Sequence, residues 1–192
     1  MRLRPFAKIL KFARDERGIS AVEFGLIAPF MALIYFGCIE LSLMMTVDRK
    51  VTGATAALGD LTSRAASVNN SDLTDIFEAT RMVMQPHNMT GIRMRVSSLY
   101  EDSGQVKVGW SDGCNLTPLV ADVAVTIPDN LIPTDGTIIM AEIEYDYYSG
   151  IGYFFSSSKT LTDKFYLRPR RVDSITRDRT SGAFSCAYTP PP

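Results

Sequence analysis

The sequence predicts an α+β protein in which a single N-terminal transmembrane helix extends into a domain with a further helix and an antiparallel β-sheet. Three observations predict this class: an apolar block of membrane-spanning length near the N-terminus, helical periodicity directly after it, and alternation of apolar and polar residues over most of the remainder. Apolar residues make up 46% and charged residues 21% of the 192 residues, which excludes a mainly disordered chain. The net charge of -1 argues against a nucleic-acid-binding protein.

A basic segment precedes the apolar block. The first 18 residues hold six basic and two acidic residues, whereas the other 174 hold 14 basic and 19 acidic ones. Residues 24–47 then contain a single charged side chain, Glu40. As a helix, these residues would be about 36 Å long, compared with about 30 Å for the hydrocarbon core of a bilayer. Because excess positive charge stays on the cytoplasmic side, we expect the N-terminus inside and the chain from Asp48 onward outside.

A cleaved secretory signal peptide is the alternative interpretation of this N-terminus. Ala54-Thr55-Ala56 offers a small-x-small cleavage pattern. A signal peptide, however, has an apolar region of only about 7–15 residues. The block here is longer, and the cleavage pattern lies beyond the charged residues 48–50. The sequence therefore favours a membrane span.

The segment just before the span contains the most specific motif. Residues 17–24 read RGISAVEF, and Pro29 follows within the span. This segment resembles the processing site of type IV prepilins, where a membrane peptidase cuts after glycine and glutamate is the fifth residue of the mature chain. Its continuation resembles the TadE family of the tight-adherence (Flp) pilus, which also has a proline at mature position eleven. Gly25 departs from the alanine that is usual there.

The resemblance implies a processing event and a place in the cell. A prepilin peptidase would cut between Gly18 and Ile19, and Glu23, Phe24 and Pro29 would serve processing and assembly. The chain would be a minor pilin or pseudopilin that helps to assemble an adhesion pilus, without a cofactor. Its partners would be the peptidase, other pilin or pseudopilin subunits, inner-membrane pilus assembly proteins and the lipid bilayer, with no nucleic acid. It would cross the bacterial inner membrane once, with a cytoplasmic N-terminus and a periplasmic C-terminal domain.

Two carboxylates in the apolar helix have a physical interpretation of their own, because a carboxylate in a membrane is costly unless it is paired. Cleavage after Gly18 would create an α-amino group at Ile19, which could pair with Glu23 of its own helix or of a neighbouring subunit. Alternatively, Glu23 is solvated among the lipid headgroups. Glu40 either reaches the outer interface as a hydrated carboxylate or contacts a partner helix within the membrane.

Helical spacing continues after the span and predicts a helix that projects from the membrane with one apolar face, formed by Val51, Ala54, Leu58 and Leu61. A second helix follows, with Ser71 or Asp72 as its N-cap and Pro86 as its stop. The resulting organisation begins with a basic cytoplasmic leader (residues 1–18) and a transmembrane helix (19–47). A periplasmic helical region (48–86), a β-rich periplasmic domain (87–175) and a flexible tail (176–192) follow.

Alternation of apolar and polar residues predicts the strands. Residues 92–97 and 106–110 form a hairpin around a turn at residues 102–104. Residues 120–127 alternate as well, and residues 138–148 form the strongest strand, with which residues 161–168 could pair. The aromatic run at residues 151–155 is either a plug in the core or an exposed patch for another subunit or the membrane surface.

Cysteine positions predict one disulfide. Cys114 and Cys186 both follow the span, so both would meet oxidising conditions, whereas Cys38 lies within it. A bridge between them would close a loop of about 70 residues and contribute about 4 kcal/mol through chain entropy. Two free thiols are the alternative.

The sequence favours no enzyme. His87 is the only histidine, no cysteine–histidine spacing suits zinc, and neither a phosphate-binding glycine loop nor a Gly-x-Ser-x-Gly elbow occurs. We therefore expect no catalytic residue, no metal and no cofactor. The arginines at residues 168–171, with Arg177 and Arg179, would form a solvated face or a docking patch for an acidic partner. The alternatives to a pilus role are a membrane-anchored periplasmic binding or sensor module without pilin processing, and an anchored serine–lysine hydrolase.

Overall fold

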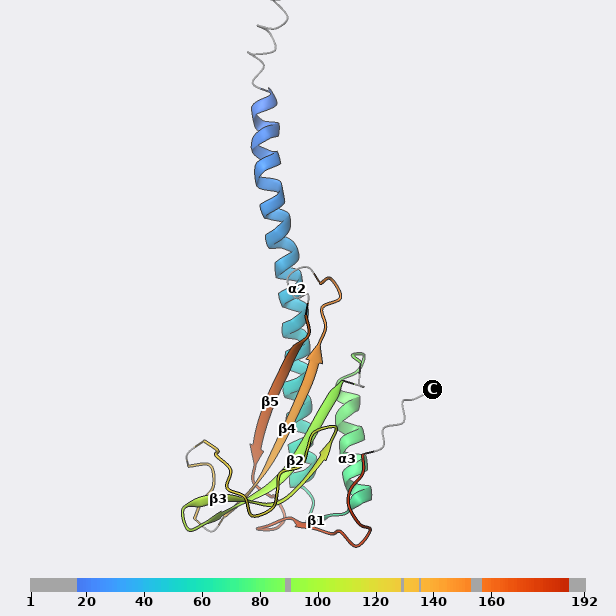
Figure 1. The fold of residues 1–192 in the computed structure, drawn as a ribbon, viewed down its shortest axis with the longest axis vertical. Helices are drawn as coiled ribbons and strands as arrows, with labels where there is room; N and C mark the ends of the chain where they lie inside the picture. Colours follow the sequence, from blue (N-terminus) through green and yellow to red (C-terminus); the bar gives the residue numbers. More distant parts are fainter. Residues whose placement is uncertain (1–16, 89–90, 129, 135, 153–156, 187–192) are drawn as a thin grey trace, which may run out of the picture.

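The computed structural model describes residues 17–88, 91–128, 130–134, 136–152 and 157–186. It confirms the α+β class: a long N-terminal helix, a second helix and an antiparallel four-stranded sheet (Figure 1). In chain order the elements are α2 (Arg17–Ser63), β1 (Ser67–Val68), α3 (Asn70–Val83), β2 (Ile92–Asp102), β3 (Gln105–Cys114), β4 (Thr137–Tyr147), β5 (Lys159–Leu167) and β6 (Thr176–Arg177).

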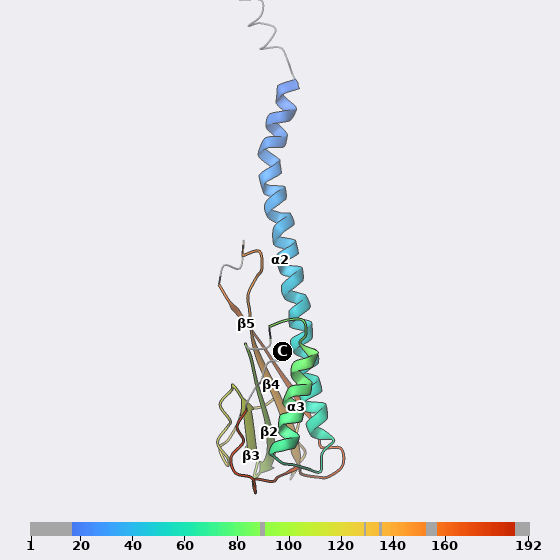
Figure 2. The same cartoon turned by 90° about the vertical axis from the view of Figure 1, so that its right-hand side faces the viewer.

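Helix α2 is a single helix of 47 residues that continues through Pro29. Its N-terminal half stands clear of the domain, whereas its C-terminal half lies against the sheet (Figures 1 and 2). The free half exposes large apolar side chains on every side; Phe24 and Phe30, for example, are 69% and 68% exposed. Within the part of the chain that the structure describes, α2 is the helix long and apolar enough to cross a membrane.

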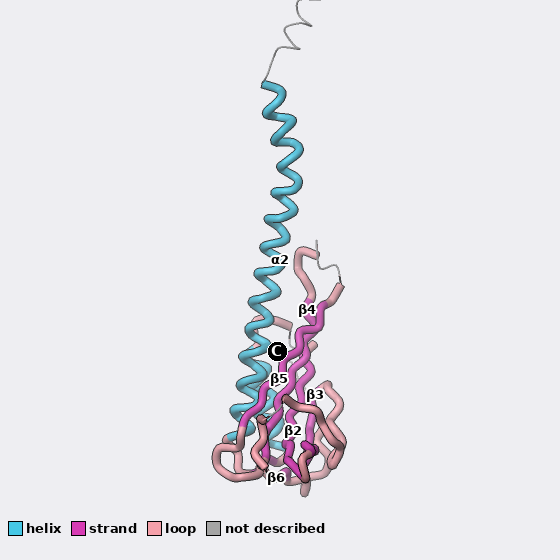
Figure 3. The backbone as a smooth tube through the Cα atoms, turned by 90° about the vertical axis from the view of Figure 1, so that its left-hand side faces the viewer, coloured by secondary structure: helices cyan, strands magenta, loops and turns pink. Residues whose placement is uncertain are grey.

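The C-terminal half of α2 supplies one wall of the core. Its buried residues lie three or four positions apart and so share one face: Val47, Val51, Ala54 and Leu58. This face packs against β4 and β5 (Figure 3), and α3 lies beside α2 on the same side of the sheet (Figure 2). The strand order is β3-β2-β4-β5, with neighbours antiparallel. Burial of alternate residues in β4 confirms the predicted strand, because Ala141, Ile143, Tyr145 and Tyr147 all belong to the core.

The opposite face of the sheet is held by cross-strand ion pairs. The register places Arg93 opposite Glu144 and Arg95 opposite Glu142. Arg93 also reaches Asp146, with 2.6 Å between Nη1 and Oδ2, and Arg95 Nε lies 2.6 Å from Glu142 Oε2. Hydrogen bonds donated by Arg93 and then Thr160 hold the pKa of Asp146 below its usual value. These pairs fix the register of β2 against β4.

The cap of α3 differs from the prediction of Ser71 or Asp72. Asn69 is the N-cap: its Oδ1 accepts the backbone N–H of Asp72 at 3.0 Å, and Asp72 Oδ2 accepts the N–H of Asn69 at 3.0 Å. The sequence contains several capping residue types in a row, and the reciprocal pair is available only when Asp72 is the third helical residue.

The strand predicted over residues 120–127 is wrong. Backbone bonds join this segment to the edge of β3, including one from Val108 N–H to the carbonyl of Val123 at 3.2 Å. Asp122, however, has a φ of 62°, in the left-handed region, and this conformation interrupts an extended strand. Val120 and Val123 are consequently 71% and 51% exposed despite the alternating pattern.

Part of the segment expected to be a flexible tail is paired with the domain. Thr176 and Arg177 form β6, which runs parallel to β1, and Ile175 just before them is 1% exposed. Residues 187–192 of that tail lie outside the described residues. Helix α2 continues past Val47, the predicted end of the span, and Val47 itself is buried in the core at 3% exposure.

We predict that Leu58→Ala lowers the free energy of unfolding by about 2–5 kcal/mol, because Leu58 is fully buried between α2 and the sheet. Thermal unfolding of the detergent-solubilised protein can be followed through the fluorescence of Trp110, whose Nε1 donates to the carbonyl of Ile175 at 2.7 Å. Leu61→Ala is the matched control, since Leu61 is 37% exposed on the same helix. Equal losses from both variants would contradict this packing.

Candidate functional site

The predicted processing residues lie in the first turns of α2. Gly18, Ile19 and Glu23 are all exposed on the free half of the helix. Ile19 and Glu23 are four residues apart and therefore neighbours on one helix face, so an amine at Ile19 would lie within reach of the Glu23 carboxylate. A Cβ added at Gly18 would meet no atom within 4 Å. The fold itself therefore has no steric need for glycine at this position. A need for glycine here would come from an interaction outside the described chain.

The rest of the motif belongs to a continuous apolar surface. Phe24 is exposed, and Pro29 lies inside the free half of α2. Exposed apolar side chains surround the helix here, among them Val22, Leu26, Ile27, Met31 and Ile34. A helix that is apolar on all sides is stable only when lipid or other apolar helices cover it.

Glu40 lies where the free half of α2 meets the domain, and it is fully buried. The hydroxyl of Ser149, in the connection between β4 and β5, donates a hydrogen bond to Glu40 Oε1. Ser149 Oγ in turn accepts the backbone N–H groups of Ile151 at 3.3 Å and Gly152 at 3.1 Å. The sequence predicts either water or a partner helix around Glu40, whereas the structure places the chain's own domain there. The contact joins residues 109 positions apart, so no local pattern could reveal it.

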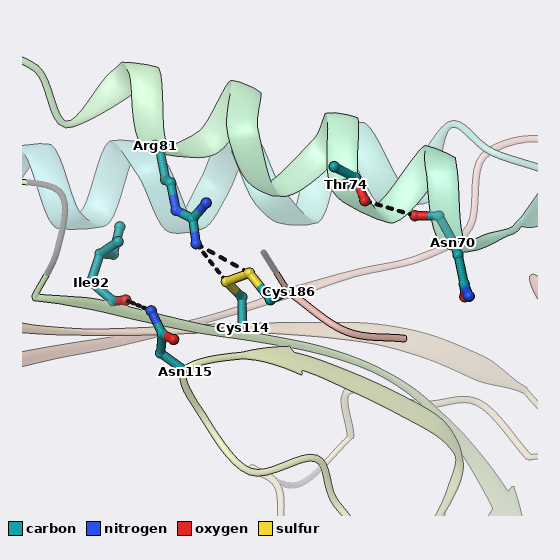
Figure 4. Close-up of a disulfide and its surroundings, with 7 residues drawn as sticks. All are labelled: Asn70, Thr74, Arg81, Ile92, Cys114, Asn115 and Cys186. Carbon is teal, nitrogen blue, oxygen red and sulfur yellow. Dashed lines mark hydrogen bonds between the residues drawn. A yellow bond between two sulfur atoms is a disulfide. The ribbon is translucent and has the colours of Figure 1, made fainter. Parts of the chain in front are cut away.

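Cys114 and Cys186 form a disulfide in the structure, with their Cα atoms 5.1 Å apart (Figure 4). It ties the end of β3 to the C-terminal segment. Arg81 of α3 points at the bridge and is 2% exposed; its Nη2 lies 2.6 Å from Cys114 Sγ and 3.2 Å from Cys186 Sγ. Sequence reasoning missed Arg81, because an arginine beside the apolar stripe of α3 gives no signal of burial. Cys38 is free and exposed on α2.

The Arg177 side chain is buried, which corrects its interpretation as part of a solvated face or docking patch, whereas Arg168, Arg170, Arg171 and Arg179 are exposed. The Arg177 side chain is 3% exposed, and its Nε lies 2.7 Å from Asp112 Oδ2. Arg179 also contacts Asp112, at 3.5 Å. Arg170 lies 2.5 Å from Asp60, and its backbone N–H donates to the carbonyl of Ser63 at the end of α2. These contacts fasten the C-terminal segment to the domain.

A hollow of about 530 Å³ lies between the end of α3 and the ends of β2 and β4. His87 lines it together with Tyr145, Tyr147 and Tyr148. Burial, followed by the positive charge of Lys50, lowers the pKa of His87. Asp146, which also lines the hollow, is bound by Arg93 and Thr160. Among the described residues, no cluster of three or more histidine, cysteine, aspartate or glutamate side chains could hold a metal ion.

Residues 18–58 match the family model described as TadE-like protein. The match confirms the resemblance noted from the sequence over these residues, which form most of α2 and include every predicted motif residue from Gly18 to Pro29. The comparisons with curated proteins and with solved structures gave no match.

We predict that protein isolated from its native membrane and denatured without reduction has one reactive thiol, from Cys38. After reduction three thiols should react, and the free energy of unfolding should fall by about 4 kcal/mol, because the closed loop spans 72 positions. Mass spectrometry of alkylated protein gives the count. Three reactive thiols before reduction would contradict the disulfide.

Proposed function

Since residues 18–58 are a TadE-like segment, which associates the chain with the tight-adherence pilus, we propose that it is a minor pilin or pseudopilin. It acts by membrane-anchored subunit assembly after a prepilin peptidase removes the leader. One observation carries the proposal: the half of α2 that begins at the Gly18, Glu23 and Pro29 motif is also the half that stands free of the domain with its apolar side chains exposed.

The proposed mechanism uses the new N-terminus. Cleavage of the peptide bond between Gly18 and Ile19 leaves a positively charged amine at the start of an apolar helix. When subunits pack side by side, Glu23 of one helix pairs with the amine of its neighbour, and this pair sets the axial register between them. Misalignment is costly because the surrounding side chains and lipid exclude water, so a separated pair would leave each charge without a partner in an apolar environment. The apolar surface supplies non-directional attraction, while the ion pair supplies alignment.

The proposed orientation puts the N-terminus in the cytoplasm and the domain in the periplasm, with α2 as a single anchor in the bacterial inner membrane. The basic leader supports it, because positive charge is retained inside. The disulfide supports it as well, because such bonds persist in oxidising compartments. The partners are the prepilin peptidase, other pilin or pseudopilin subunits and inner-membrane assembly proteins. In this proposal the chain is not an enzyme.

The second candidate function is a membrane-anchored periplasmic binding or sensor module without pilin processing. The hollow beside His87 favours it, because three tyrosine side chains and a histidine there could contact a small ligand. The two candidates differ at the N-terminus, since only the pilin role requires cleavage.

We predict that Gly18→Leu leaves the full-length precursor when the protein is co-expressed with the pilus peptidase. A bulky side chain would fill the position next to the bond that is cut. Gly25→Leu is the matched control: it lies on the same helix, and a Cβ at either glycine meets no atom within 4 Å, so neither change disturbs the fold. Intact mass measures the outcome. Processing of Gly18→Leu to the same extent as Gly25→Leu would overturn the proposed cleavage site.

We also predict that Glu23→Ala is processed normally but co-purifies with pilus subunits at least about tenfold less, because removing one partner of a desolvated ion pair costs about 3–5 kcal/mol. Glu78→Ala is the control, since Glu78 is exposed on α3, away from the free half of α2. Quantitative immunoblotting of the purified assembly gives the ratio. Undiminished co-purification of Glu23→Ala would show that the carboxylate does not set the register.

A further inference from the structure

We propose that residues 148–152, which follow β4, form a second membrane contact, which lies in the lipid headgroup layer beside α2 and is held there by Glu40. This inference rests on the proposed insertion of α2 and adds how the domain sits on the bilayer. We call residues 148–152, at the end of β4, the tip.

The burial of α2 indicates where the span ends. Side chains from Gly18 to Phe36 are exposed apart from the partly buried Ala28, whereas Glu40 is the first fully buried residue of α2. Beyond it one face of the helix is buried, while Leu41, Leu43 and Met45 on the other side stay about half exposed. The free stretch is about 28 Å long at roughly 1.5 Å per residue, close to the hydrocarbon thickness of about 30 Å. The apolar sequence continues to Val47, but Val47 is already in the domain core. Because sheet edges and polar loops do not lie in hydrocarbon, the hydrocarbon ends before Glu40.

The tip lies at this level. It is the part of the domain that extends furthest toward the N-terminal end of α2 (Figures 1 and 2). The bond from Ser149 to Glu40 fixes its height on the helix, about one turn beyond Phe36. Tyr148 and Ile151, on either side of this bond, are 72% and 45% exposed, so both are available to a surface outside the chain.

The chemistry of the connection fits lipid headgroups. Its residues 148–158 include no charged side chain, and the exposed Lys159 follows directly at the start of β5. Tyrosine favours the membrane–water interface because its ring is apolar and its hydroxyl is polar. A lysine beside it would attract anionic headgroups. The sequence left open whether the aromatic run at residues 151–155 is a core plug or an exposed patch. Residues 153–155 of this run lie outside the described residues. Tyr148, Ser149 and Ile151 carry the proposal.

Glu40 positions the tip. Its buried carboxylate accepts the Ser149 hydroxyl, which also accepts the N–H groups of residues 151 and 152, so one serine oxygen ties the turn together and to α2. Loss of this bond would weaken the attachment of the tip to the helix, and the depth of Tyr148 would be less closely fixed.

The test reads the depth of a tryptophan at the tip. The full chain carrying Tyr148→Trp is reconstituted into phosphatidylethanolamine–phosphatidylglycerol vesicles that contain lipids with a nitroxide either near the headgroup or deep in the acyl chains. Trp110 stays in place and the parent protein gives its contribution. We expect the shallow nitroxide to quench the new tryptophan more strongly than the deep one.

Two further variants make the result decisive. Phe30→Trp, in the free half of α2, should be quenched more strongly by the deep nitroxide, and Val120→Trp, exposed beside β3, by neither. Quenching at position 30 without quenching at position 148 would overturn the tip contact and leave the anchor intact. Absence of quenching at both would overturn the anchor as well. If acrylamide quenching at position 148 instead falls only after another pilus subunit is added, that result would show that the tip contacts that subunit and not lipid.

The role of Glu40 is tested in the Tyr148→Trp background. Ser149→Ala and Glu40→Ala should each reduce the shallow quenching and increase quenching by aqueous acrylamide, because the tip loses the hydrogen bond that ties it to α2. Ser158→Ala, an exposed serine in the same connection, is the matched control and should change neither. Unchanged quenching in both variants, with the protein still folded by Trp110 fluorescence, would show that Glu40 does not hold the tip.

Discussion

The structure depends on one constraint: α2 is a single continuous helix whose two halves need different surroundings. Its N-terminal half is apolar on all sides, which only a membrane or a bundle of apolar helices can accommodate. Its C-terminal half is apolar on one face, formed by residues such as Val51 and Leu58, and the sheet and α3 cover that face. No turn separates the halves. The domain therefore folds around the extension of the free apolar half of α2, and the position of the domain relative to that half is set by helix geometry.

The contacts that join distant segments reinforce this arrangement. Ser149 bonds to Glu40 near the upper end of the domain, while Arg170 and Asp60 join at the lower end of α2. The disulfide and Arg81 connect β3, α3 and the C-terminal segment. Such a domain resembles a rigid body fixed to a helix. This rigidity suits a subunit whose proposed work is to pack in register, because a shift of the helix is passed directly to the domain.

The sequence predicted what local periodicity controls. The apolar block, the stripe of α2, the β2–β3 hairpin and strand β4 all follow from spacing, and the motif from Gly18 to Pro29 led to the family that the comparison confirmed over residues 18–58. Prediction from the sequence failed where backbone geometry or contacts between distant residues determine the local structure. Asp122 interrupts an alternating segment through its φ angle, and Arg177 is buried because Asp112, 65 positions away, pairs with it. The attachment of Glu40 to Ser149 belongs to the same class.

Amide hydrogen exchange of the full chain in lipid nanodiscs tests the continuity of α2 most directly. The account predicts that residues 37–50 exchange as slowly as residues 51–63, because the helix that leaves the membrane is the helix that enters the core. Fast exchange at residues 37–50, between two protected segments, would contradict it. The anchor and the domain would then be separate units joined by a flexible tether.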